Sequence, residues 1–369
     1  MTSSETTERL VDTIALLSIP GIGRGRFNRL VKRFGSPGAA LAAVKGDIEA
    51  LPGFSTTIAG AIKEHYDPEA ARRTAERIAK LGWAVLYNDS PDYPSRLAQI
   101  DDAPPVIFRL GRPIERGERM VALVGTRHAT ENGRRFTHQL AGDLTQAGLT
   151  VISGMAEGID SAAHRGALDR GGRTVAVWGT PLDQVYPASN RELAERIKAQ
   201  GAIYSEYLPG VEGSPSNFPE RNRIISGMAE AVVVVEAGRK SGALITAQCA
   251  LDQGRDVFAV PGSPLAENFV GTNELIKMGA RLLTSADDIL NELPQLRGEM
   301  SARRINRLAD LTEMERKLVD LLAPGPQQID VLCRLTGLAV NAIMEYLLAL
   351  ELKGVVQELP GKRFALNEP

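Results

Sequence analysis

The stretch MVALVGTR, residues 120–127, indicates the fold class. Its first five residues are apolar, which is typical of a strand buried on both faces of a parallel sheet, and a glycine-containing turn follows them. After a helix-length amphipathic segment at 134–147, the arrangement is repeated in TVISGMAEGID, residues 150–160. A strand, a helix and a second strand in this order predict a right-handed crossover within an α/β sheet.

The alternation of short apolar runs and helical segments continues along the middle of the chain. Buried strands are predicted at 120–124, 150–152, 174–178, 202–204, 231–235 and 256–260. Helices are predicted at 134–147, 161–170, 191–200 and 243–253, and extended segments precede the first strand at 83–87 and 105–110. The sequence therefore predicts an α/β fold with a doubly wound, mostly parallel sheet.

The regions on either side of this sheet have a different pattern. Apolar residues before it recur at helical spacing, and one helix is predicted between Asp67, which can cap it, and Gly82, which can end it. After it, three helical segments and a terminal hairpin follow one another as in a winged helix-turn-helix. The expected organisation is a helical domain at 1–82, the sheet domain at 83–294, a linker at 295–308 and a winged helix at 309–369.

Composition excludes several classes of protein. The 369 residues are 43% hydrophobic and 24% charged, an ordinary balance for a folded chain. Cys249 and Cys333 are the only cysteines and have no paired spacing, so neither a disulfide framework nor a zinc site is expected. The sequence contains no export signal and no apolar run long enough to cross a membrane, so a cytoplasmic protein is expected.

The net charge of −2 is distributed unevenly. Residues 1–85 contain twelve basic and nine acidic side chains, whereas residues 309–369 contain six basic and nine acidic ones. A winged helix that reads DNA needs a basic face, so this acidic one is expected to bind protein. In the first region, glycine turns at 19–23 and 51–54 lie beside the basic stretch 24–33, which fits either nucleic-acid contact or a solvated helix face.

The turns that follow the predicted strands are candidates for binding anions, because ligands of open α/β sheets lie beyond the carboxyl ends of the strands. Glycine lets backbone N–H groups approach a phosphate, and a following helix adds its positive dipole end. The candidate turn residues are Gly125, Thr126, Arg127, Ser153, Gly154, Gly158, Lys240, Ser241 and Gly242. Their spacing matches neither the dinucleotide-binding motif nor a P-loop.

Several charged side chains have two interpretations each. Arg127 and Lys240 are predicted to contact phosphate, with a salt bridge as the alternative. Arg191 is a further candidate or a solvated charge, and Arg221, Asn222 and Arg223 are either structural anchors or ligand contacts.

Catalytic roles have weaker support in the sequence. Asp160 is expected to cap a helix and His164 to be a packed or exposed polar residue. Glu206 and Glu236 end strands and are candidates for a general acid, although their separation in sequence gives no geometry. Cys249 is expected to lie in the core.

The central motifs together resemble the DNA processing protein A family (DprA, also called Smf), recombination mediators of bacterial natural transformation. The matching residues include VGTR at 124–127, SGMAEGID at 153–160, YP at 186–187, SEY at 205–207, FPERNR at 218–223, SGALITA at 241–247 and GTN at 271–273. This set is far more specific than any one of its members.

The resemblance implies an extended Rossmann domain that binds single-stranded DNA, forms a homodimer, and helps load the RecA recombinase, without a cofactor and without catalysis. The family's basic pocket carries over onto Arg127, Lys240 and Arg191, and its R-N-R motif onto 221–223. A helical domain resembling a sterile alpha motif and a winged helix also occur in the family. Glu157 departs from the family's pattern, because it puts an acid in a turn that is expected to bind an anion. Arg191 also departs from it, because arginine differs in shape from lysine.

Two other classes of function remain open in the sequence. One is a nucleotide-binding protein or an N-glycosidic hydrolase of nucleoside phosphates, which would use the same crevice with Glu206 or Glu236 as its acid. The other is an interaction scaffold, as the acidic winged helix suggests.

Overall fold

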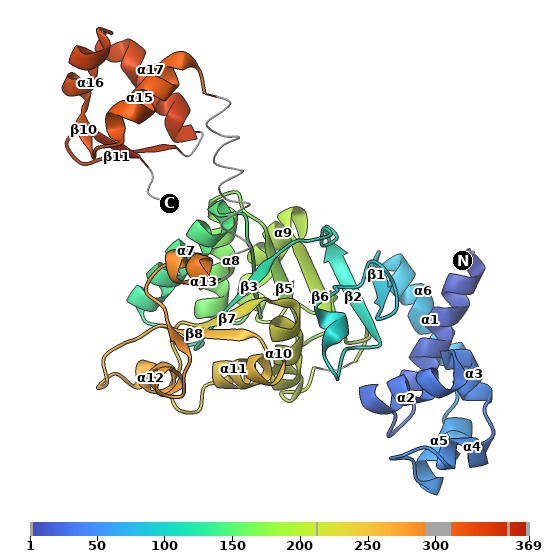
Figure 1. Cartoon of the computed structure of the whole chain (residues 1–369). Helices are drawn as coiled ribbons and strands as arrows, with labels where there is room; N and C mark the ends of the chain where they lie inside the picture. The colour runs from blue at the N-terminus through green and yellow to red at the C-terminus, as the bar shows by residue number, and fades with distance from the viewer. Residues whose placement is uncertain (1–2, 212, 293–310, 353–354, 367–369) are drawn as a thin grey trace. The chain divides into compact units, whose positions relative to one another are not determined.

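The computed structural model describes residues 3–211, 213–292, 311–352 and 355–366, and divides the chain into two compact units, Met1–Ala286 and Asp287–Pro369 (Figure 1). The predicted linker at 295–308 lies outside the described residues. The predicted boundary at residue 82 falls inside the first unit and remains a prediction.

The first unit contains a sheet with the strand order β1-β2-β6-β5-β4-β3-β7-β8-β9. Its strands are β1 Ala84–Tyr87, β2 Val106–Gly111, β3 Met120–Val124, β4 Thr150–Ser153, β5 Thr174–Val177, β6 Ala202–Ser205, β7 Ala231–Val234, β8 Asp256–Ala259 and β9 Arg281–Leu282. All pairings from β6 to β9 are parallel, and β1 and β2 add an antiparallel edge. The six predicted strands are confirmed as β3 to β8, and the α/β fold with a mostly parallel sheet is confirmed with them.

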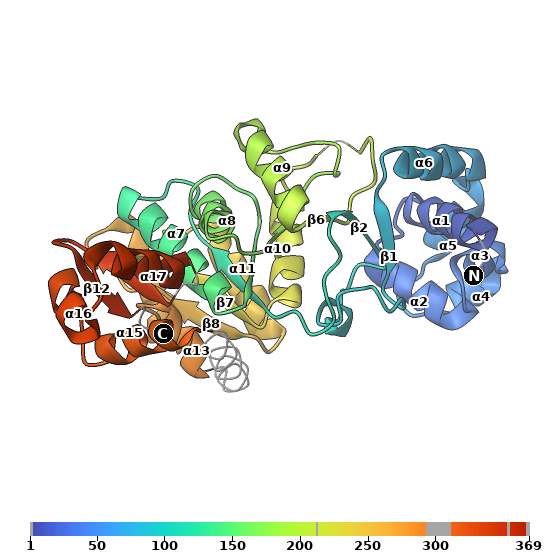
Figure 2. The same ribbon diagram turned by 90° about the horizontal axis from the view of Figure 1, so that it is seen from above.

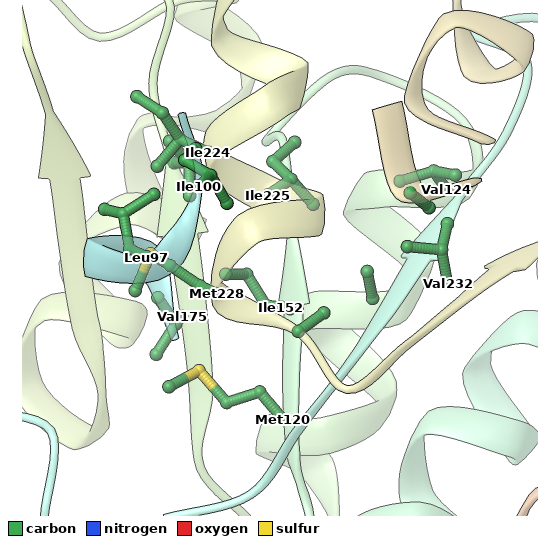
Figure 3. Close-up of a cluster of buried hydrophobic side chains, with 14 of the residues drawn as sticks. Leu97, Ile100, Met120, Val124, Ile152, Val175, Ile224, Ile225, Met228 and Val232 are labelled. Carbon is green, nitrogen blue, oxygen red and sulfur yellow. The ribbon is translucent and has the colours of Figure 1, made fainter. Parts of the chain in front are cut away.

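Helices cover both faces of this sheet. They are α7 Glu131–Gln146, α8 Ile159–Asp169, α9 Arg191–Gln200, α10 Asn217–Met228, α11 Gly242–Asp252 and α12 Val270–Lys277, with short helices η1 Leu97–Gln99, η2 Ala188–Asn190 and η3 Glu267–Phe269. Side chains of α10, including Ile225 and Met228, pack on one face against Ile152 and Val232, as Figure 3 shows. Alternate residues of the strands, such as Ala176, face α8 and α9 on the other side.

The helix α10 was not predicted. Its first half has no apolar periodicity, because Pro219 and the four consecutive polar residues at 220–223 interrupt it. Pro219 lies in the first turn, where a helix tolerates proline because the missing N–H has no partner there.

The N-terminal helices precede the sheet and partly pack on it. They are α1 Ser3–Leu17, α2 Arg24–Phe34, α3 Pro37–Ala42, α4 Lys45–Glu49, α5 Thr56–Glu64 and α6 Pro68–Lys80. The predicted helix is confirmed as α6, where the Asp67 carboxylate accepts a hydrogen bond from the Ala70 N–H at 2.9 Å. Leu30 and Ile62 belong to a core of α1 to α5, whereas Ile14 and Ile78 share a core with the sheet. Figure 2 shows α1 and α6 beside β1.

The second unit has the order of a winged helix, as predicted. After α13 Ala286–Glu292, its elements are α15 Glu313–Leu322, β10 Gln327–Gln328, α16 Ile329–Thr336, α17 Val340–Leu352, β11 Val356–Leu359 and β12 Arg363–Leu366, with the sheet order β10-β12-β11. A capping box between Thr312 and Glu315 begins α15, and Gly337 in the left-handed conformation ends α16. Among the described residues, no single helix is long and apolar enough to cross a membrane; α16 and α17 pass that test only as a pair bent by 109°.

Candidate functional site

A crevice lies at the carboxyl ends of β3 and β7. From β3 the chain runs outward through β4, β5 and β6, and then returns through α10 to β7 on the other side of β3. Ligands of open α/β sheets bind at such a reversal, because the turns after the two central strands separate there. The cavity has a volume of about 810 Å³ and is lined by residues 124–128, Ala156, Asp160, Tyr186, Pro215, Phe218, Pro219, Arg221, Asn222, Ile225, 238–243, Thr246, Glu267 and Asn268.

Three exposed cations line this crevice. Arg127 follows β3, and its guanidinium lies 5.4 Å from the centre of the Phe218 ring. Arg239 and Lys240 follow β7. Within the described part of the chain, none of the three forms an ion pair with a carboxylate, so their charge is available to an anion.

The start of α11 adds a second source of positive potential. Ser241 is its N-cap, and the hydroxyl oxygen accepts a hydrogen bond from the Ala243 N–H at 3.4 Å. A side chain at Gly242 would meet no atom within 4 Å, so the first turn is open towards the crevice. The partial positive charge of a helix N-terminus favours a phosphate at this position.

Arg221 lies in the floor of the crevice and is an anchor. It is 4% exposed, and its Nη1 donates to the carbonyl of Gly154 at 2.6 Å and to that of Val177. Gly154 leaves the space for this guanidinium, because a Cβ there would lie 2.6 Å from Nη2. Burial lowers the pKa of Arg221 to about 10, and burial also raises the pKa of the neighbouring Asp160 carboxyl.

The other two members of the R-N-R motif have separate roles. Asn222 lines the crevice and donates from Nδ2 to the carbonyl of Gly242 at 3.2 Å, which ties α10 to the start of α11. Arg223 does not line the crevice. Its Nη2 lies 2.6 Å from a carboxylate oxygen of Glu206, and its Nε lies 3.2 Å from Asp102.

Glu206 connects the sheet to the N-terminal helices. Its side chain is 7% exposed and also accepts from Arg24 of α2 at 2.9 Å. Burial disfavours the charge on Arg24, but the carboxylates of Glu206 and Glu220 outweigh it and raise the pKa of that guanidinium. Glu206 is therefore held by two arginines outside the crevice.

The turn after β4 supports the crevice. The Ser153 hydroxyl donates to the carbonyl of Leu123 at 2.6 Å. Gly158 has φ +80°, and a Cβ there would clash with the carbonyl of Thr126; one at Gly125 would lie 2.5 Å from Ile159. These glycines allow two turns to pack closely. Ser153, Gly154 and Gly158 are not among the residues that line the cavity, and their contact with an anion stays a prediction.

The structure corrects the capping role predicted for Asp160. The N-cap of α8 is Gly158, and Asp160 lies in the first turn, where its carboxylate accepts from the Ala156 N–H at 3.2 Å. His164 is buried, and its Nδ1 lies 2.7 Å from the Thr174 hydroxyl oxygen. Arg191 is exposed at the start of α9 and is not among the lining residues.

Glu236, the other candidate acid, is fully buried. Its carboxylate accepts from the N–H and hydroxyl of Thr130 and from Asn268 Nδ2 at 3.0 Å. Because Thr130 caps α7 and Asn268 lines the crevice, this carboxylate connects the start of α7 to a residue of the crevice. Glu236 is not among the residues that line the crevice, so its carboxyl does not face a bound ligand.

Some lining residues were not singled out from the sequence as contacts. Tyr186 and Phe218 form an aromatic pair with ring centres 5.0 Å apart, and Tyr186 is 48% exposed. Arg239 is marked only by its neighbour Lys240, and no sequence signal points to Asn268. An exposed aromatic ring beside unpaired cations suits a nucleobase next to its phosphate.

The glycine turns of the N-terminal helices are held together by arginines. Arg26 donates to the carbonyls of Gly21 at 2.8 Å and Gly53 at 2.9 Å, and Arg29 donates to that of Pro52 at 2.6 Å. These two side chains of the basic stretch 24–33 therefore have structural roles.

Residues 84–294 match the family described as DNA recombination-mediator protein A, and residues 306–362 match the DprA winged helix domain. Protein Smf of Synechocystis sp. is 37% identical over 314 residues, covering 76% of this chain and 79% of that protein.

The solved structures that are similar to this one include two of DNA processing protein A. The structure of DNA processing protein A from Streptococcus pneumoniae has a TM-score of 0.67 and 32% identity, covering 79% of this chain and 98% of that one. The structure of DNA processing protein A from Helicobacter pylori, described for its single-stranded DNA binding mode, has a TM-score of 0.51 and 27% identity, covering 58% and 96%.

Proposed function

Since the chain belongs to the family of DNA recombination-mediator protein A, we propose that it binds single-stranded DNA in the crevice between β3 and β7 and assists the loading of RecA recombinase onto that DNA. The observation that carries the proposal is the set of unpaired cations, Arg127, Arg239 and Lys240, beside the open start of α11. Dimer formation through the sheet domain, implied by the resemblance to the family, belongs to the same proposal.

The chemistry of the crevice suits a single strand better than a duplex. Phosphates of a single strand bind the cations and the helix N-terminus without regard to sequence, and an unstacked base can lie on Tyr186. Bases inside a duplex are already stacked and leave this ring unused. We therefore expect single strands to bind more tightly than duplexes of the same sequence.

The alternative of an N-glycosidic hydrolase has less support. Glu206 is bound by two arginines away from the crevice, and Glu236 is buried among donors. Neither carboxyl is placed to protonate a leaving base.

Fluorescence anisotropy with labelled single strands tests the DNA-binding proposal. Arg127→Ala removes one charge-assisted contact of about 1.5–3 kcal/mol, so affinity should fall about 10- to 150-fold for every sequence tested. The slope of log affinity against log salt should become shallower by about 0.7, because one phosphate fewer is neutralised. Arg135→Ala is the matched control, because Arg135 is also exposed but lies outside the crevice.

Unchanged binding by the Arg127→Ala protein would exclude this crevice as the site. RecA loading is tested separately, by the delay before RecA hydrolyses ATP on strands coated with single-strand-binding protein. The wild-type chain should shorten this delay and the Arg127→Ala variant should not. Incubation with nucleoside monophosphates tests the hydrolase alternative, which predicts release of free base.

A further inference from the structure

The winged helix carries a groove between α17 and the β11–β12 hairpin. The groove has a volume of about 220 Å³ and is lined by Met344, Glu345, Leu348, Glu351, Glu358 and Phe364, which we call the wing groove. This volume is below the range of about 300–1,000 Å³ that small-molecule pockets occupy, so the groove fits a side chain better than a cofactor.

The floor of the wing groove is apolar and partly open to solvent. Phe364 is 2% exposed and belongs to the core, and Met344 packs against that core. Leu348 is one helical turn further along α17 and is 56% exposed. Since positions four apart lie on one face of a helix, Met344 and Leu348 form a continuous apolar strip beside the hollow.

The rim of the wing groove is acidic. Glu345 and Glu351 are exposed and form no ion pair within the described part of this unit. Glu358 is paired with Lys362 at 3.1 Å. The sequence of α17, VNAIMEYLLALEL, contains no lysine or arginine.

This distribution of charge argues against nucleic acid as the occupant. In winged helices that bind DNA, the helix at the position of α17 enters the major groove, where cations on it neutralise phosphates. Here the same helix would bring two unpaired carboxylates towards the phosphates. The wing groove instead complements a surface that has apolar side chains flanked by cations.

We propose that the wing groove binds a basic amphipathic helix of a partner protein. Leucine-like side chains four residues apart on that helix would cover Leu348 and enter the hollow, and flanking lysines or arginines would lie against Glu345 and Glu351. The acidic winged helix is then a protein-docking module, separate from the crevice that binds single strands.

The test uses the full-length chain and three labelled probes in fluorescence anisotropy. The first is a helical peptide several turns long with leucines on one face and lysines elsewhere; the second has glutamates in place of the lysines; the third is a DNA duplex. We expect the basic peptide to bind and the acidic peptide to remain free. If the acidic peptide binds equally well, or if neither binds, the proposal is wrong.

Two variants and two matched controls locate the binding. Leu348→Ala and Glu351→Lys should each weaken the basic peptide about tenfold or more, because a central apolar anchor and a rim charge are lost. Leu335→Ala and Asp330→Lys make the same changes at exposed positions of α16 outside the groove and should leave binding unchanged. Equal effects of variants and controls would overturn the proposal.

The duplex probe and a single strand complete the design. Glu351→Lys should leave single-strand binding unchanged, because that proposal concerns the other unit. Duplex binding that is lost in the Leu348→Ala protein would assign the wing groove to DNA and overturn the inference, whatever the outcome for the crevice.

Discussion

Replacing Glu206 by glutamine keeps the size of a buried side chain and removes its charge. The carboxylate is 7% exposed and lies between Arg24 at 2.9 Å and Arg223 at 2.6 Å. The Arg223 side chain is 6% exposed, and its remaining acidic partner is Asp102, which is 55% exposed and lies 3.2 Å away. The change therefore leaves a buried guanidinium with a solvated, weaker partner.

The two sides of this network should respond unequally. Removing one partner of a buried ion pair costs about 3–5 kcal/mol, and since Asp102 retains part of the interaction we expect about 3 kcal/mol for Glu206→Gln. Arg24→Ala leaves Glu206 paired with Arg223. The second acidic partner of Arg24 is Glu220, which is 48% exposed and is solvated by water once Arg24 is removed. We expect about 1 kcal/mol for that variant.

Urea denaturation followed by tryptophan fluorescence measures both values. The two tryptophans, Trp83 and Trp178, are buried in the first unit and report on its unfolding. Glu220→Gln is the control and should change the free energy of unfolding by less than about 0.5 kcal/mol. Equal losses for Arg24→Ala and Glu206→Gln would refute the assignment of Arg223 as the buried partner that needs the charge.

Three other predictions concern residues of the first unit. Burial lowers the pKa of His164 from 6.5 to about 3, so the unfolded chain takes up a proton at a higher pH than the folded chain does. The free energy of unfolding should therefore fall by up to about 1.4 kcal/mol per pH unit as the pH drops below 6.5. His164→Gln should flatten this part of a pH series of unfolding midpoints, and parallel curves for the two proteins would contradict the prediction. Glu236→Gln places an amide NH2 group against N–H donors and should lower stability in a thermal melt by about 2–3 kcal/mol. The same change at the exposed Glu157 should leave the melt unaltered. Gly158→Ala should lower the free energy of unfolding by at least about 2 kcal/mol, because φ is +80° and the new Cβ would meet the Thr126 carbonyl. Gly242→Ala is the control and should be tolerated, because a Cβ there would meet no atom within 4 Å. Similar urea midpoints for the two variants would argue against close packing of the turns.

The strands of the sheet could be predicted because burial on both faces leaves a direct trace in the sequence. A strand such as β7, Ala231–Val234, is a short run of apolar residues with nothing polar to break it. The helix α10 is buried as well, yet its burial leaves no such trace, because Arg221, Asn222 and Arg223 are all less than 10% exposed and each contacts a polar partner. Without a solvated face it has no amphipathic period for a sequence to display.

The roles of the glycines and carboxylates depend on contacts between distant residues. A glycine after a strand is compatible with a bound phosphate and with a close backbone neighbour, and only the structure shows that Gly158 faces Thr126 whereas Gly242 faces open space. Likewise Glu236 and Thr130 are 106 residues apart in the chain. Local sequence patterns contain no information on such a pair.

The number of unpaired cations in the crevice limits how steeply DNA binding can depend on the salt concentration. Of the arginines near the crevice, Arg221 is engaged by carbonyls and Arg223 by carboxylates. The unpaired cations lining the crevice, within the described residues, are Arg127, Arg239 and Lys240. About 0.7 counterions are released per neutralised phosphate of a single strand, so these three cations support a slope of log affinity against log salt of only about −2 for one crevice. A markedly steeper measured slope would mean that cations outside the crevice, such as Arg191, or a second copy of the chain also contact the strand.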